Sequence, residues 1–221
     1  SLAFIRRNAE NKQPFYLAYW PMMTGFIPNP RKTTVARSLL GDGFTNVDAF
    51  IGQVMDELTA LGIAGTTSEV AHAGNGPMVH APPPGLGMAE TVFMGGKCDY
   101  WEGGVRVAAL AWWPGLIKAG TVIGVRFHEV DLYTTFARLA GATDRVPTDR
   151  IVDGIDQTAL LVNGDTAGRR DYNFVYTGNI LAATTKGRYK RVWVGDHPGL
   201  PGAAFYDLVN DPREVNPALV P

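Results

Sequence analysis

A short glycine-rich stretch in the middle of the chain constrains the fold more than any other segment. Residues 93–107 read Phe-Met-Gly-Gly-Lys-Cys-Asp-Tyr-Trp-Glu-Gly-Gly-Val-Arg-Val, which places Lys97 between two glycine pairs. Glycine tolerates positive φ and lets the backbone approach a ligand or another backbone closely. A lysine ammonium on such a loop is a compact charge that can reach an anionic oxygen. The stretch therefore indicates a tight loop with an anion contact at Lys97, although Gly-Gly-Lys alone is common in loops.

Composition limits the class of protein. A length of 221 residues favours one domain, with at most a small appended subdomain. The formal net charge of −1 gives no electrostatic basis for a nucleic-acid or membrane partner. The apolar runs are too short to span a bilayer, and Cys98 as the single cysteine excludes an internal disulfide. The chain opens without a secretory signal, so we expect a soluble protein that is cytoplasmic, or periplasmic or secreted if a signal was removed.

Apolar periodicity predicts an α/β core. The run at residues 14–20 is apolar and aromatic, as in a buried strand of a parallel sheet. Helical spacing of apolar residues follows Thr45, which we expect to cap a helix that ends at Gly62. Further elements are predicted as strands at 69–73 and 105–112 and a helix at 132–140. The alternation of strands and helices implies an α/β sandwich.

The pattern changes after Asp171. Short apolar and aromatic runs separated by turn residues predict antiparallel strands at residues 173–176, 180–185 and 190–194, with a further short strand from Phe205. We therefore expect a small antiparallel C-terminal subdomain.

The longer string Gly-x-Lys-x-x-x-Trp-Glu-Gly-Gly-x-Arg-Val, followed by Trp-Pro-Gly at 113–115, is far more specific than Gly-Gly-Lys. It resembles the segment of type I sulfatases, within the alkaline-phosphatase superfamily, whose lysine binds the sulfate group. Collinear similarity extends along nearly the whole chain, at residues 12–17, 48–62, 131–141, 153–156 and 205–214. The resemblance implies an α/β sandwich whose mixed, mostly parallel sheet is flanked by helices. Residues 1–170 would form the C-terminal part of that core, and residues 171–221 the small antiparallel subdomain.

The resemblance also implies a chemistry that this chain encodes only in part. Sulfatases use a formylglycine nucleophile, made from a Cys/Ser-x-Pro-x-Arg motif, and a calcium ion held by oxygen ligands. Cys98 is followed by Asp99 and Tyr100, and the motif occurs nowhere in the chain. We therefore interpret the chain as the C-terminal portion of a sulfatase: a fragment, a processed chain or a truncated relative.

Individual site positions follow from the same resemblance. Lys97 matches the sulfate-binding lysine, and Asn75 matches a metal-ligating asparagine, but Gly74 replaces the family aspartate beside it. Thr24 or Met23 occupies the place of the active-site histidine, and neither can act as a general acid near neutral pH. His128 could reach the pocket as a substrate contact, with a helix-capping or surface role as the alternative.

Other side chains near the motif have structural interpretations. His72 and His80 flank the Asn75 position, where imidazole is a poor calcium ligand. We expect Trp101 and Glu102 to brace the Lys97 loop and Arg106 to pair with a carboxylate.

The leading hypothesis is sulfate monoester hydrolysis, with the formylglycine and the calcium supplied by sequence absent from this chain. The chain alone is then predicted to be inactive. The alternative is a catalytically inactive sulfatase-like binding module, which Gly74 and Thr24 favour. A third hypothesis is a phosphonate or phosphate-ester hydrolase of the same superfamily. Expected partners are a sulfated small molecule or carbohydrate, and either an N-terminal sulfatase half or a second copy of the chain.

Overall fold

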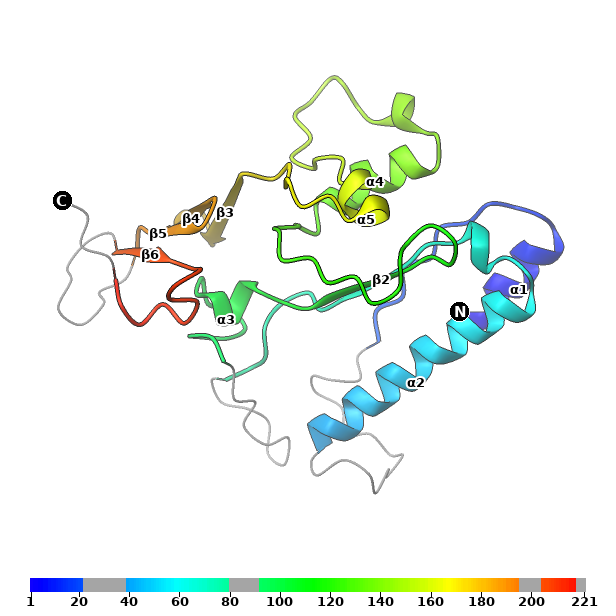
Figure 1. The fold of residues 1–221 in the computed structure, drawn as a ribbon, viewed down its shortest axis with the longest axis horizontal. Helices are drawn as coiled ribbons and strands as arrows, with labels where there is room; N and C mark the ends of the chain where they lie inside the picture. The colour runs from blue at the N-terminus through cyan, green and yellow to red at the C-terminus, as the bar shows by residue number, and fades with distance from the viewer. Residues whose placement is uncertain (22–38, 80–91, 195–203, 218–221) are drawn as a thin grey trace.

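The computed structural model describes residues 1–21, 39–79, 92–194 and 204–217, which contain the helices and strands labelled in Figure 1. The α-helices are α1 (Leu2–Glu10), α2 (Leu39–Ala60), α3 (Glu102–Val105), α4 (Asp131–Leu139) and α5 (Thr158–Asn163). Single 3-10 turns occur at Ala64–Thr66 and Thr143–Arg145. The strands are β1 (Glu69–His72), β2 (Ala109–Trp112), β3 (Tyr172–Thr177), β4 (Ile180–Lys186), β5 (Tyr189–Val192) and β6 (Ala204–Asp207). None of the described helices is both long and apolar enough to cross a membrane.

Helices α1 and α2 pack at one end of the molecule. Ile5 and Leu58 are buried there, and the Arg6 guanidinium donates to both carboxylate oxygens of Glu57 at 2.7 and 2.6 Å. The predicted helix before Gly62 is confirmed, and Gly62 takes the positive φ of 70° that a helix-terminating glycine favours. The predicted cap at Thr45 is wrong, because the helix begins earlier and the Thr45 hydroxyl donates back to Gly41 O at 3.0 Å.

Strands β1 and β2 form a two-stranded antiparallel ribbon in which Glu69 pairs with Trp112 and His72 with Ala109. Every strand pairing in the described residues is antiparallel, so the mostly parallel sheet that we predicted is absent from them. A parallel pair needs a crossover connection, which is usually a helix. The described part of the connection between β1 and β2 contains only the short helix α3.

Two further predictions about strands need correction. Residues 14–20 form no strand, and Tyr16 and Trp20 are 72% and 88% exposed, because no described strand pairs with this run in a hydrogen-bonded ladder. The strand predicted at 105–112 is confined to β2, because Glu102–Val105 turn as the helix α3 and Arg106 only then becomes extended.

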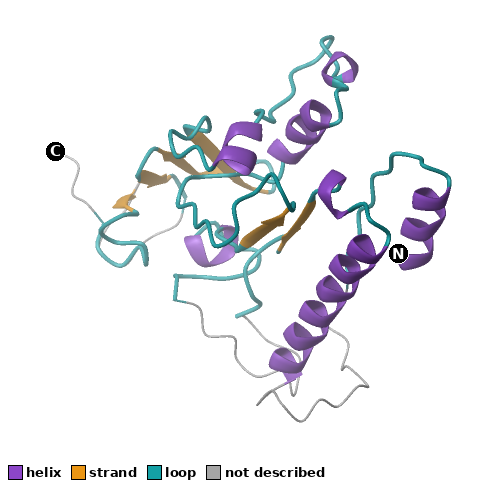
Figure 2. Ribbon diagram, turned by 45° about the vertical axis from the view of Figure 1, so that its right-hand side comes forward, coloured by secondary structure: helices purple, strands orange, loops and turns teal. Residues whose placement is uncertain are grey.

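The four-stranded sheet has the order β3-β4-β5-β6, with each neighbouring pair antiparallel. Its strands confirm those predicted after Asp171. One face buries a cluster made of Ala183, Val192, Ala204 and Tyr206, against which Tyr100 and Trp101 pack. Figures 1 and 2 both place α3 beside this sheet, at the end of the β1–β2 ribbon that lies away from α1 and α2. The proposed boundary between residues 170 and 171 stays a prediction.

Candidate functional site

The loop that carries Lys97 lies directly against the loop that carries Asn75. The backbone N–H of Lys97 donates to Pro77 O at 2.7 Å, and that of Gly76 donates to Gly104 O at 2.9 Å. These two bonds join segments that the resemblance to sulfatases placed in one site. We call this contact the glycine junction, which comprises residues 74–77 and 94–104.

Close packing explains why glycines are required in the junction. A Cβ atom added at Gly76 would lie 1.7 Å from Gly103 O, and one added at Gly103 would lie 2.3 Å from Gly95 O. A Cβ atom at Gly104 would lie 2.3 Å from Asp99 O. Because these neighbours are backbone atoms that cannot rotate away, a side chain at any of these positions would force the loops apart.

Lys97 is half-buried within a tight turn between Gly96 and Asp99. The Asp99 N–H donates to Gly96 O at 2.9 Å, and the Gly96 N–H donates to Asp99 Oδ2 at 2.9 Å. Cys98 has φ 77°, which a residue other than glycine rarely adopts. The turn therefore fixes the backbone from which the Lys97 side chain extends.

Trp101 and Glu102 brace this loop, as predicted. The Trp101 ring meets the Tyr206 ring edge-on at a centroid distance of 5.7 Å. The Glu102 N–H donates to Glu214 Oε2 at 2.6 Å, and Glu102 Oε1 lies 3.2 Å from Lys190 Nζ. The loop is thus held to the four-stranded sheet by an aromatic contact and by charged groups.

Arg106 also has a structural role. Its Nη1 lies 3.9 Å from Glu102 Oε2, and its guanidinium lies over the Phe93 ring, 4.8 Å from the centroid. The predicted pairing of Arg106 with a carboxylate is confirmed. Sequence reasoning did not find Lys190 or Glu214 as partners of Glu102, because nothing in the sequence marks a strand lysine as buried.

The residues around Asn75 do not by themselves form a calcium site. Asn75 is exposed and its Nδ2 donates to Gly76 O at 2.6 Å, while Gly74 has no side chain to bind an ion. In the described part of the chain, no group of at least three His, Cys, Asp or Glu side chains could hold a metal ion. Calcium takes about 6–8 oxygen ligands, so one amide oxygen is far from sufficient. A Cβ atom at Gly74 would meet nothing within 4 Å among the described residues, so their packing does not impose this glycine.

Three of the positions considered from the sequence lie outside the described residues, namely Met23, Thr24 and His80. His128 is half-buried beside the first turn of α4, where its backbone N–H donates to Asp131 Oδ2 at 3.0 Å. Its Nδ1 accepts a hydrogen bond from the Val130 N–H at 3.2 Å. His128 thus takes part in the N-terminal turns of α4, and a substrate contact at His128 stays a proposal.

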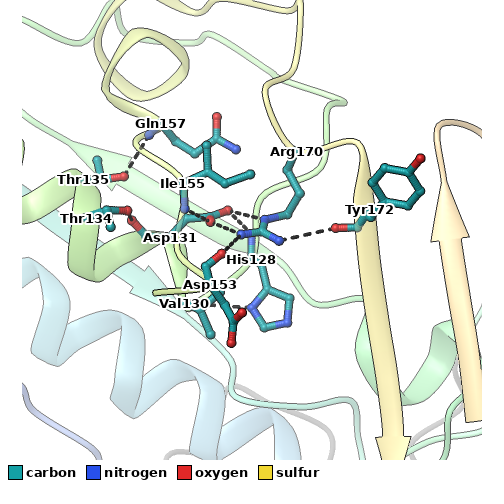
Figure 3. A network of polar contacts seen from close by, with 10 residues as sticks. All are labelled: His128, Val130, Asp131, Thr134, Thr135, Asp153, Ile155, Gln157, Arg170 and Tyr172. Atoms are coloured by element: carbon teal, nitrogen blue, oxygen red, sulfur yellow. Dashed lines mark hydrogen bonds and ion pairs between the residues drawn. The ribbon is translucent and has the colours of Figure 1, made fainter. Parts of the chain in front are cut away.

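The buried carboxylate of Asp131 organises a second network, drawn in Figure 3. Asp131 accepts hydrogen bonds from Arg170 Nε at 2.8 Å, from Arg170 Nη2 and from the Ile155 N–H at 2.8 Å. Arg170 also donates to Asp153 O at 2.8 Å. The network ties α4 to the loop 153–157 and to the segment that leads into β3.

The environments of three acidic groups differ. Burial alone would raise the pKa of Asp131, but the hydrogen bonds from Arg170, Ile155 and His128 outweigh it and hold the pKa below its usual value. Burial raises the pKa of Glu214 above its usual value, although Lys190 opposes the rise. Burial, together with the Glu214 and Asp211 carboxylates, raises the pKa of Tyr206 to about 12.

Fold and site together define a tight lysine-bearing loop on a scaffold of helices and antiparallel strands. Comparison with known proteins assigns the family, because the Sulfatase family matches residues 4–142. The chain belongs to the sulfatase family.

Individual relatives support the same family. N-acetylgalactosamine-6-sulfatase of Homo sapiens is 35% identical over 194 residues, which cover 86% of this chain and 36% of the relative. Steryl-sulfatase of Mus musculus is 32% identical over 196 residues, covering 86% of this chain and 31% of the relative. The crystal structure of PsFucS1 sulfatase from Pseudoalteromonas sp. has a TM-score of 0.82 at 27% identity and covers 98% of this chain but 46% of its own. The chain thus spans about a third of the length of these curated relatives.

Proposed function

We propose that this chain contributes the sulfate-contacting lysine of a sulfatase that hydrolyses sulfate monoesters of small molecules or carbohydrates. The observation that carries the proposal is the glycine junction, in which the 2.7 Å hydrogen bond from Lys97 N to Pro77 O joins the lysine turn to the Asn75 loop. Relatives named N-acetylgalactosamine-6-sulfatase and steryl-sulfatase support a sulfate ester as the substrate class.

Lys97 would act through charge and position. Hydrolysis of a sulfate ester needs a nucleophile, neutralisation of the non-bridging oxygens and a proton for the leaving oxygen. An ammonium held by a rigid turn neutralises charge with little reorganisation when the substrate reacts, and it can donate a proton. The bond from Gly96 N to Asp99 Oδ2 at 2.9 Å supports such a preorganised turn.

The nucleophile and the calcium would come from sequence outside this chain. Cys98, followed by Asp99, lacks the Pro and Arg of the formylglycine motif. The Asn75 loop offers one amide oxygen where a hard cation needs many, so millimolar calcium is expected to leave the melting temperature of the chain unchanged. A reproducible calcium-dependent rise would show that other residues compensate for Gly74.

We also propose that a further sulfatase segment covers the exposed apolar surface near the β1–β2 ribbon. Leu110 on β2 is 69% exposed. The PsFucS1 sulfatase fold, which this chain matches over 46% of that structure's length, has the remaining length to supply such a cover. Large exposed apolar areas favour association. Self-association of the purified chain in size-exclusion chromatography would favour a second copy instead.

A sulfatase-like binding module without activity is the second candidate, and Gly74 is the observation that favours it. Since a Cβ atom there would meet no described atom within 4 Å, close packing at the Cβ position does not explain the absence of an aspartate. Both candidates keep Lys97 as an anion contact. They differ in whether the protein that contains this chain turns over a sulfate ester.

The experiment that tests the proposal is a sulfate titration of the purified chain, followed by amide NMR. We expect shifts centred on residues 96–99 and at least tenfold weaker binding in Lys97→Met. Lys118→Met, which removes an exposed lysine, is the matched control and should bind as the parent does. Equal sulfate affinity in Lys97→Met and the parent would contradict the proposal. An aryl sulfate assay of the same material should show no turnover, and turnover by the isolated chain would disprove an external nucleophile.

A further inference from the structure

A buried triad of charges joins the Lys97 loop to the four-stranded sheet. Lys190 on β5 is fully buried, and its Nζ lies 2.8 Å from Glu214 Oε1 and 3.2 Å from Glu102 Oε1. Glu102 begins α3 and Glu214 follows β6, so separate parts of the chain meet at Lys190. We infer that this triad positions the Lys97 loop on the sheet; the inference rests on the proposed function in taking Lys97 as the sulfate contact.

A charged residue at the Lys190 position is costly, which argues for a role beyond filling the core. Removing an ammonium from water is unfavourable, and packed apolar residues often replace buried ion pairs without loss of stability. The sheet itself needs no charge here, since the β5 ladder pairs Lys190 with Thr185 and Tyr206 through the backbone. Both carboxylates come from outside the strands. The triad therefore determines where α3 and the segment after β6 lie relative to the sheet.

Backbone hydrogen bonds link the position of Glu102 to the position of the turn that carries Lys97. The Glu102 N–H donates to Glu214 Oε2 at 2.6 Å, and the adjacent Gly103 N–H donates to Met94 O at 2.7 Å. Lys97 N then donates to Pro77 O at 2.7 Å on the neighbouring loop. The loop makes these contacts through backbone atoms, which cannot adjust as a flexible side chain can. A displacement of Glu102 must therefore displace the turn that carries Lys97.

A second contact holds the Lys97 loop to the four-stranded sheet, so the triad can be altered without detaching the loop. The Trp101 ring packs edge-on against Tyr206, with the centroids 5.7 Å apart, independently of the charges. Neutralising one carboxylate should therefore loosen the loop without detaching it from the sheet. Glu214→Gln is the suitable variant because it keeps the size of the side chain and leaves the pair of Lys190 with Glu102 in place.

The test is hydrogen exchange of backbone amides in Glu214→Gln, with Glu10→Gln as the matched control at an exposed glutamate on α1. We expect exchange at Lys97 and Gly103 to accelerate at least tenfold in Glu214→Gln, while amides of the β3–β4 ladder change less than twofold. Glu10→Gln should leave all of these amides unchanged. Unaltered exchange at Lys97 and Gly103, or an equal acceleration throughout the sheet, would overturn the inference.

A second pair of variants addresses the cation. Lys190→Met should accelerate exchange at Lys97 more than Glu214→Gln does, and Lys186→Met, at an exposed lysine on β4, is its control. If Lys190→Met does not fold, the result with Glu214→Gln decides. Hydrogen exchange is measured without sulfate, so its result does not depend on sulfate binding. If Lys97 fails to bind sulfate, the proposed function is refuted, but the exchange result still decides whether the triad positions the loop.

Discussion

Asp131 and Arg170 form a buried bidentate ion pair that joins the start of helix α4 to the segment leading into strand β3. The carboxylate is fully buried, and the Arg170 side chain is 9% exposed. Backbone N–H groups of His128 and Ile155 also donate to the carboxylate, so both of its oxygens are occupied. Several segments therefore depend on one side chain.

Asp131→Asn should be strongly destabilising. The substitution leaves the buried Arg170 guanidinium without its counter-charge, and breaking a buried pair in this way costs about 3–5 kcal/mol. Urea unfolding followed by circular dichroism measures the loss. Asp149→Asn is the control, because it removes a carboxylate from an exposed pair with Arg150 and should leave the unfolding midpoint unchanged. Similar midpoints for Asp131→Asn and the parent would contradict the assigned role.

The stability contributed by Asp131 should depend on pH with a defined sign. Its folded pKa lies below its ordinary value of 3.8, so between the two pKa values the unfolded chain binds more protons. The contribution is then complete above about pH 3.8 and is lost as the pH falls through the folded pKa. Unfolding free energies of the parent and Asp131→Asn should therefore converge below pH 3.8. A constant difference down to the lowest accessible pH would argue against this linkage.

Tyr206→Phe should be nearly neutral at pH 7 and protective in alkali. The Tyr206 hydroxyl is buried and has no hydrogen-bond partner among the described residues, so removing it loses no bond seen there. With a folded pKa raised from 10.0 to about 12, Tyr206 costs the parent stability as the pH rises above 10, because only the unfolded chain ionises readily there. Thermal melts at pH 8 and at pH 11 compare the variants. If Tyr206→Phe loses as much thermal stability between pH 8 and pH 11 as the parent does, then groups other than Tyr206 cause the alkaline loss of stability.

Gly76→Ala and Gly74→Ala should differ sharply although the positions are two residues apart. The added Cβ atom would lie 1.7 Å from Gly103 O in the first variant, and in the second it would meet nothing within 4 Å in the part of the chain that the structure describes. Overpacking against rigid backbone should cost about 3 kcal/mol or more at Gly76, and Gly74→Ala should be nearly neutral. The fraction of soluble chain and its urea midpoint report the difference. Equal stability of the two variants would show that the glycine junction opens freely.

Local patterns in the sequence predicted much of the secondary structure. The hairpin strands after Asp171, the helix at α4 and the stop of α2 at Gly62 follow from alternation, helical spacing and glycine, which act over a few residues. The string around Lys97 likewise predicted a tight loop braced by Trp101 and Glu102. These features could be read because the residues that determine them are neighbours in the chain.

Only the tertiary structure decided which distant segments and side chains contact those elements. Residues 14–20 have the composition of a buried strand, but they form no strand pairing with the described segments because a strand needs a partner that local sequence does not specify. In the sequence, Lys190 cannot be distinguished from an exposed strand lysine, and only the structure shows that it is paired with Glu102 and Glu214. Likewise, only the structure shows that Arg170 is paired with the buried Asp131. The sequence thus determined the local conformations and the family. Burial and long-range charge pairing depend on contacts between distant segments, so only the folded chain determined which loop Lys190 holds in place.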